Sequence, residues 1–399
     1  MLLYDYTLSW ILVLDIYLPM YNIIYVNDIL FLYLIVDHSK RKCDYMHKLT
    51  YTLLPKLRSR KHNLNVEIDL YSYATELYNE LDRIDIINRV KETPQLGVIK
   101  IPHLKLGKTR YDYIMLQLYL HKIIKGNLQA HMRYTYNNVV KSKEFELGKL
   151  QFTKNDTPTI GDILQLLTII YNIGHFYNTF TASRAIILAA DKNDSFDNYI
   201  VNISDSERFK STATKILKRR NYHRFHLLNS LLVLEKCDQS KKSVSLCIEL
   251  LYTYLNEEEL SSENKLRYVF DIFKKIRTVS YIAYDLQIAN TPLTVDLCNE
   301  KAMVLFLKEL ISEYNNTQST NHLIKSITKL LDDTVYNENS NAICYYNISR
   351  KMTSLLLNYD YCSMSYYDDL FVNKESILNR QYPQHRDYLQ TQILKLTFE

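Results

Sequence analysis

The sequence predicts an all-α protein, and three observations carry this prediction. The 399-residue chain contains only six glycines and seven prolines, whereas strand-rich folds need frequent turn residues. Apolar residues recur at helical spacing over most of the chain. Only Gly97–Leu106 has the pattern of a strand, so we expect at most a short hairpin there. Hydrophobic residues make up 47% of the chain and charged residues 23%, which is sufficient for a buried core.

The first 45 residues differ from the rest of the chain. The apolar run Trp10–Val36 is long enough to span a bilayer, and the basic sequence "HSKRK" follows it. Five polar or helix-breaking residues interrupt the run: Asp15, Pro19, Asn22, Asn27 and Asp28. Each buried Asp costs about 2.5–3.5 kcal/mol in membrane insertion. Three interpretations stay open: a membrane anchor, packed soluble helices, or a leader that precedes a start at Met46.

Helical periodicity begins near Glu67, and residues 46–295 are expected to form one helical domain. Its helical segments are Ile68–Val90, Tyr111–Ile124, Gly161–Ile173, His223–Cys237, Lys242–Leu255 and Lys265–Ala289. Asp156, Thr157 and Pro158 precede the third segment, as expected of a helix start, and Thr291-Pro292 closes the last. Residues 296–399, including the apolar segment Lys301–Tyr314, are expected to add C-terminal helices.

The charge and the cysteine content do not indicate a particular class of binding partner. The net charge is only +5, and the dense basic run Lys215–Arg224 has two readings. It is either a solvated helix end or a site for phosphate or nucleic acid; the first is favoured, so nucleic acid is not expected as a partner. The six cysteines contain no C-x-x-C pair, so we expect neither a zinc cluster nor a disulfide framework. A cytoplasmic location fits this best.

Three segments suggest a family. They are "GKTRYDY" (107–113), "YNIGH" (171–175) and "RTVSYIAYD" (277–285). In this order they resemble the motifs of the HD superfamily of metal-dependent phosphohydrolases, especially its dNTP-triphosphohydrolase branch. The resemblance covers about Glu67 to Pro292. It implies an HD-domain-like helical bundle around a pocket, with Arg110, His175, Tyr281 and Asp285 as ligand-binding residues.

The resemblance also implies that the metal site has been lost. The family binds its metal through a His, a His-Asp pair and a later Asp; the residues that stand here are Tyr113, Tyr171, Asn172 and Arg277. Phe180 and Ser183 stand where the branch carries a catalytic His and Glu. A neutral tyrosine, an amide and a guanidinium cannot replace carboxylate and imidazole ligands. We therefore expect no metal and no other cofactor.

The function expected from this pattern is that of a catalytically degenerate HD protein, a pseudoenzyme. It would bind a nucleotide, a phosphate, a protein partner or a second copy of itself in a metal-free pocket. Two alternatives stay open. One is an active metal-dependent phosphohydrolase with a different ligand set, drawn from His103, His121, His175, His223 and His226 with nearby Asp. The other is a helical scaffold whose resemblance to the family is accidental.

Overall fold

The computed structural model describes residues 47–54, 64–99, 108–135, 158–261, 264–288, 318–336 and 339–382. Of these, 71% are helical and the strands form one two-stranded sheet, which confirms the all-α prediction. In chain order the elements are β1 (His47–Leu54), β2 (Leu64–Leu70), α2 (Ser72–Arg83), α3 (Ile86–Glu92), α4 (Arg110–Thr135), α5 (Ile160–Asn172), α6 (Thr179–Ala190), α7 (Asp194–Val201), α8 (Glu207–Lys218), α9 (Tyr222–Glu235), α10 (Lys242–Leu255), η2 (Glu257–Glu259), α11 (Lys265–Ile288), α13 (Gln318–Leu331), η3 (Asp332–Tyr336), α14 (Asn339–Leu357), η4 (Tyr361–Ser363) and η5 (Tyr366–Val372).

The hairpin lies elsewhere than the sequence predicted. β1 pairs antiparallel with β2, so the helix expected from Ile68 begins only at Ser72. Val66, Ile68 and Leu70 are buried, while the residues between them keep more exposure; this period of two is typical of a strand with one face on the core. At the predicted site, Gly97 and the next residue form a turn, and residues 100–106 lie outside the described part of the chain.

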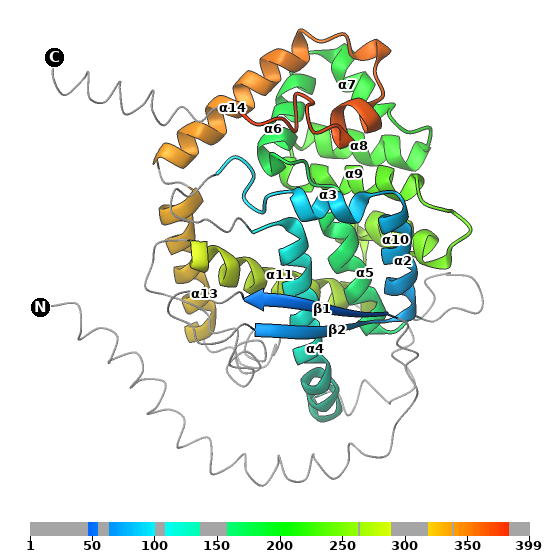
Figure 1. Cartoon of the computed structure of the whole chain (residues 1–399), viewed down its shortest axis with the longest axis vertical. Helices are drawn as coiled ribbons and strands as arrows, with labels where there is room; N and C mark the ends of the chain where they lie inside the picture. Colours follow the sequence, from blue (N-terminus) through cyan, green and yellow to red (C-terminus); the bar gives the residue numbers. More distant parts are fainter. Residues whose placement is uncertain are drawn as a thin grey trace, which may run out of the picture.

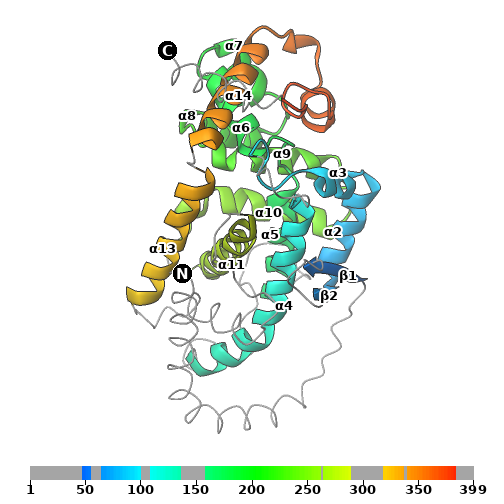
Figure 2. The same cartoon turned by 60° about the vertical axis from the view of Figure 1, so that its left-hand side comes forward.

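The helices gather into two groups that share one core. In Figures 1 and 2, α6, α7, α8 and α14 lie at one end of the molecule, and the hairpin, α4 and α11 lie at the other, with α9 and α5 between them. One cluster of buried side chains runs through both groups, from Val66 to Tyr382. The predicted boundary at residue 296 lies outside the described residues, but α14 belongs to the same core as the helices before that boundary.

Helix α5 is the central helix, and its start is fixed by its own sequence. The Thr159 hydroxyl accepts from the backbone N–H of Asp162, and the Asp162 carboxylate accepts from the backbone N–H of Thr159 (2.8 Å). This reciprocal capping box satisfies donors that a helix start leaves unpaired. All residues from Asp162 to Asn172 are buried, which is typical of a helix surrounded by other helices.

Residues 366–382, which we call the C-terminal strap, wrap around the turn that follows α5. Asn379 accepts from the backbone N–H of Tyr177 (3.0 Å), and Asn178 donates to the Leu378 carbonyl (2.9 Å). The Tyr366 hydroxyl donates to Asn229 on α9 (2.8 Å). The strap therefore links the 173–178 turn to the rest of the core.

The basic run forms ion pairs within the chain. Lys215 pairs with Glu258 and Glu259, Arg219 with Glu258, Arg220 with Asp191, and Arg224 with Glu257, at N–O distances of 2.6–3.0 Å. These acidic partners come mainly from η2, so the run presents paired charge rather than a basic patch.

The described residues test the predictions about a membrane span and about disulfides only in part. No helix among the described residues has the length and apolarity needed to cross a membrane; Trp10–Val36 lies outside them. Cys237 and Cys247 are buried and form no disulfide with any described residue.

Candidate functional site

The first predicted motif forms the start of α4. Thr109 donates its backbone N–H to the Asp112 carboxylate (2.7 Å), and Asp112 donates its backbone N–H to the Thr109 hydroxyl (3.2 Å). This is a second capping box, and it places Arg110 and Tyr113 on the first turn with their side chains in the core. Thr109 and Asp112 thus have a structural reason to be present, whatever the protein binds.

Arg110 is a buried cation at this helix start. It donates to the Gln95 carbonyl (3.0 Å), and its Nε has no hydrogen-bond partner among the described residues. Burial lowers the pKa of Arg110 to about 10, while Tyr113 and Asp285 favour the charged form. The guanidinium therefore stays charged at neutral pH.

The second motif ends α5 and begins the 173–178 turn. A Cβ added at Gly174 would lie 1.9 Å from the His226 carbonyl and 2.5 Å from the Ser230 backbone N. The backbone of Gly174 also packs through its carbonyl, which accepts from Asn229 (2.9 Å). The glycine is therefore needed because the turn lies directly against the backbone of α9. This close approach, and not a metal, explains the residue.

Arg277 on α11 lies against the end of α5. Its guanidinium carbon is 3.6 Å from the centroid of the Tyr171 ring, a stacked cation–π geometry. The Tyr113 hydroxyl donates to the Arg277 backbone carbonyl (3.0 Å), and Tyr254 hydrogen-bonds the Arg277 side chain. Burial lowers the pKa of Arg277, but Tyr171, Tyr254 and Tyr113 outweigh it and raise the pKa above its ordinary value. Arg277 Nε has no partner in the described structure.

His175 and His226 form a stacked pair beside these cations. Their ring centroids are 4.0 Å apart with an interplanar angle of 9°. Neither ring has a nitrogen in hydrogen-bond geometry with another described residue. Burial, with Arg110 close by, lowers the pKa of both imidazoles well below the ordinary value. The pair is therefore neutral at pH 7.

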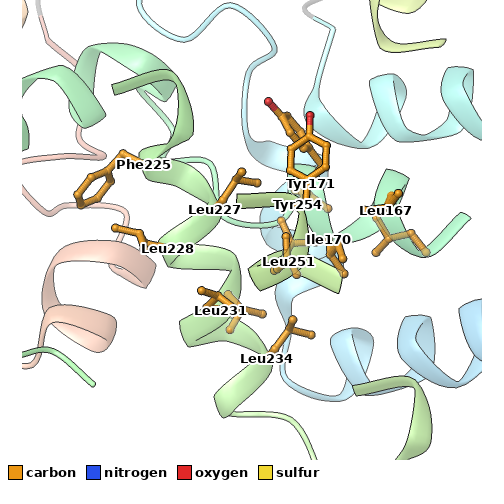
Figure 3. Close-up of a cluster of buried hydrophobic side chains, with 14 of the residues drawn as sticks. Leu167, Ile170, Tyr171, Phe225, Leu227, Leu228, Leu231, Leu234, Leu251 and Tyr254 are labelled. Carbon is orange, nitrogen blue, oxygen red and sulfur yellow. The ribbon is translucent and has the colours of Figure 1, made fainter. Parts of the chain in front are cut away.

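Together these residues make a buried polar cluster, which we call the arginine–histidine cluster. Its members are Arg110, Tyr113, Tyr171, His175, His226, Tyr254, Arg277 and Asp285. Figure 3 shows the rings of Tyr171 and Tyr254 side by side, with both hydroxyls directed away from the leucines of α9 and α10. Asp285 is buried, and Arg277 alone among the eight keeps clear partial exposure.

Most, but not all, of the predicted site residues meet in this cluster. Tyr113, Tyr171 and Arg277 come together from three helices. The amide of Asn172 instead donates to the Thr168 carbonyl one turn earlier (2.8 Å), and its oxygen has no described partner. The Tyr281 hydroxyl lies 3.2 Å from that of Thr328 on α13, while Tyr281 remains close enough to Arg277 and Asp285 for electrostatic interaction.

The histidines of the enzyme alternative do not form a metal site in the described residues. No three His, Cys, Asp or Glu side chains there lie close enough to share a metal ion. A metal ion lies in the plane of each imidazole that binds it, so the near-parallel rings of the His175–His226 pair cannot chelate one ion. His121 bonds the Thr168 hydroxyl (2.7 Å), His223 packs on Tyr222, and His103 lies outside the described residues.

Sequence reasoning missed several members and neighbours of the cluster. His226 was identified only as one possible metal ligand of the enzyme alternative. Tyr254 and the buried Gln117 were not identified; the second lies four residues after Tyr113 on the same face of α4, a spacing that would have pointed to it. Arg89 was missed as well: it is buried, and it bonds the carbonyls of Ile173 and Phe371.

No protein-family model matches the chain, and no curated protein or solved structure matches it significantly. The HD-superfamily resemblance therefore remains a prediction that depends on three short segments.

Proposed function

We propose that this chain is a cytoplasmic, catalytically degenerate relative of the HD phosphohydrolases, which binds a phosphate-bearing small molecule such as a nucleotide without a metal ion. One observation carries the proposal: the guanidinium groups of Arg110 and Arg277 meet in the same cluster, and each leaves Nε without a described partner.

The charges of the cluster favour an anion. It contains two guanidinium cations, one carboxylate from Asp285, and two imidazoles that burial keeps neutral. A buried charge without a counter-charge costs several kcal/mol. A phosphate would supply the missing negative charge, and guanidinium groups bind phosphate through paired, charge-assisted hydrogen bonds. Arg277 is the member of the cluster that is partly exposed, although its Nε is buried.

The donor set also favours a cation-free mode of binding. The cluster supplies guanidinium, phenol and stacked imidazole groups, whereas hard divalent cations need several oxygen ligands. In this mode the guanidinium groups of the chain neutralise the charge of the phosphate, which a metal ion would otherwise do.

Thermal unfolding in EDTA tests the proposal. Inorganic phosphate and nucleotides should raise Tm, because a ligand at 100 times its Kd stabilises the folded state by about 2.7 kcal/mol. Arg277→Ala should abolish the shift, and Arg277→Lys should retain only part of it, because lysine lacks the planar fork. Arg220→Ala is the matched control, since it removes an exposed arginine that pairs with Asp191.

A shift of equal size in Arg277→Ala and Arg220→Ala would contradict the proposal, as would no shift with any anion. Stabilisation that appears only when a divalent metal is added would instead support the metal-dependent enzyme.

A further inference from the structure

Gln117 on α4 has an unusual environment for a buried amide. Its side chain has no exposed surface, and neither its Nε2 nor its Oε1 has a hydrogen-bond partner in the described structure. Leaving a buried donor and acceptor unpaired is costly, and native proteins rarely do so without a reason.

A second buried glutamine, on the neighbouring helix, has both of its amide atoms paired. Gln165 on α5 donates to the Asp69 carbonyl (2.8 Å) and accepts from the Tyr71 backbone N–H (2.9 Å). Both of its amide atoms are therefore satisfied by protein. Gln117 differs from it in having no such partners, although both glutamines lie in buried helices that pack against each other.

Gln117 lies next to the arginine–histidine cluster. On α4 it follows Tyr113 by one turn and precedes His121 by one turn, and these two neighbours contact α11 and α5 respectively. The facing helix α5 carries Asn172, whose Oδ1 also has no described partner. The boundary between α4 and α5 thus offers unused donors and acceptors that continue from the cationic end of the cluster.

We propose that Gln117 is a specificity-determining residue, which binds the uncharged planar end of the ligand whose phosphate lies at Arg110 and Arg277. This inference rests on the proposed anion-binding function. A glutamine amide pairs with an edge that presents a donor and an acceptor side by side, as it does with N6 and N7 of adenine. Arg110 and Gln117 are seven residues apart, about 10 Å along the helix, a span comparable to a mononucleotide.

The chemistry therefore favours a mononucleotide with such a base edge over phosphate alone or a sugar phosphate. A second unpaired group on the facing helix, the Asn172 side-chain oxygen, would accept a hydrogen bond from an amino group of the same base. A ligand without a base would leave the Gln117 amide and the Asn172 side-chain oxygen unpaired, as they are without ligand.

Titration calorimetry in EDTA tests this inference with AMP, UMP, ribose 5-phosphate and inorganic phosphate. The wild-type protein should bind at least one nucleotide about tenfold or more tightly than ribose 5-phosphate, the discrimination expected of a bidentate pair. Gln117→Leu should remove this preference and leave the affinity for ribose 5-phosphate unchanged. Its unliganded Tm should not fall, because it removes two unpaired polar atoms.

Gln165→Leu is the matched control: it should lower Tm, because it breaks two satisfied hydrogen bonds, and keep the preference for the nucleotide. Gln117→Met replaces the leucine variant if that variant does not fold. If phosphates bind but the Gln117 variants keep the preference, or if the wild-type protein has none, this inference is wrong and the proposed function stands. If none of the four compounds binds, both are wrong.

Discussion

At residue 174 the constraint is a contact rather than a backbone angle. Gly174 does not have a positive φ, but a methyl group there would overlap the backbone of α9. Gly174→Ala should therefore force the turn and α9 apart and destabilise the protein by about 3 kcal/mol or more, because backbone atoms cannot move aside as a flexible side chain can. Urea denaturation measures the effect.

Gly161→Ala is the control for that variant. Its added Cβ meets only the ring of Tyr71, 2.5 Å away at the far edge, and alanine has the higher helix propensity by about 1 kcal/mol. The net change should be within about 1 kcal/mol. Equal destabilisation by the two variants would show that the close approach of Gly174 to α9 does not matter.

At this scale the sequence predicted part of the candidate site. The family resemblance implied that Tyr113, Tyr171 and Arg277 lie together, because their counterparts in the HD superfamily bind one metal centre, and these three residues are in contact. Rotamers were not predictable in this way. The Tyr113 hydroxyl contacts a backbone carbonyl rather than the guanidinium, and the Asn172 amide turns back onto α5.

Among the elements, the C-terminal strap depends on one asparagine. Asn379 donates to the carbonyls of Leu370, Phe371 and Asn373, and accepts from the Tyr177 N–H. Asn379→Ala should cost about 2–4 kcal/mol, because it leaves several buried backbone groups unpaired. Amide exchange at residue 177 should accelerate as the strap loosens. Exchange as slow as in the wild-type protein would contradict this role.

Asn202→Ala is the matched control for the strap variant. Its amide bonds only the Asn198 carbonyl at an exposed position, so its loss should change stability by no more than about 0.5 kcal/mol. A loss of stability as large as that of Asn379→Ala would mean that removing any asparagine side chain has this effect. The contacts of the strap would then not be its cause.

Helices were the most predictable elements, and the hairpin was not predictable. Segments such as α5 and α10 repeat apolar residues at helical spacing. This spacing can be read from the sequence even where the helix is surrounded by other helices. The strand β2 is seven residues long and continues directly into α2. Its alternation of buried and exposed residues was too short to be distinguished from the helical pattern that follows.

For the whole molecule, acid stability depends on buried neutral histidines. Burial lowers the pKa of His121 to about 3, and the pKa values of His175 and His226 also lie well below that of free histidine. The unfolded chain therefore binds more protons than the folded chain below about pH 6.5. Their contribution to stability is complete above that pH and is lost as the pH falls towards the folded-state pKa values.

Urea unfolding from pH 8 to pH 4 should show this loss. Three protons taken up on unfolding give a limiting slope of about 4 kcal/mol per pH unit. His121→Gln should reduce that slope by about 1.4 kcal/mol per pH unit and leave the slope above pH 7 unchanged. Stability that does not change between pH 6.5 and pH 5 would contradict the assignment of neutral histidines to the core.

The C-terminal strap also bears on the order in which the protein is made. The partner of the Tyr177 N–H lies 202 residues later in the chain, and chains leave the ribosome N-terminus first. At about 5–20 residues per second, synthesis of those residues takes roughly 10–40 s. During that interval the 173–178 turn can pack only on the helices that precede the strap, as each of them is made. The turn is therefore completed late, after every member of the arginine–histidine cluster has been synthesised.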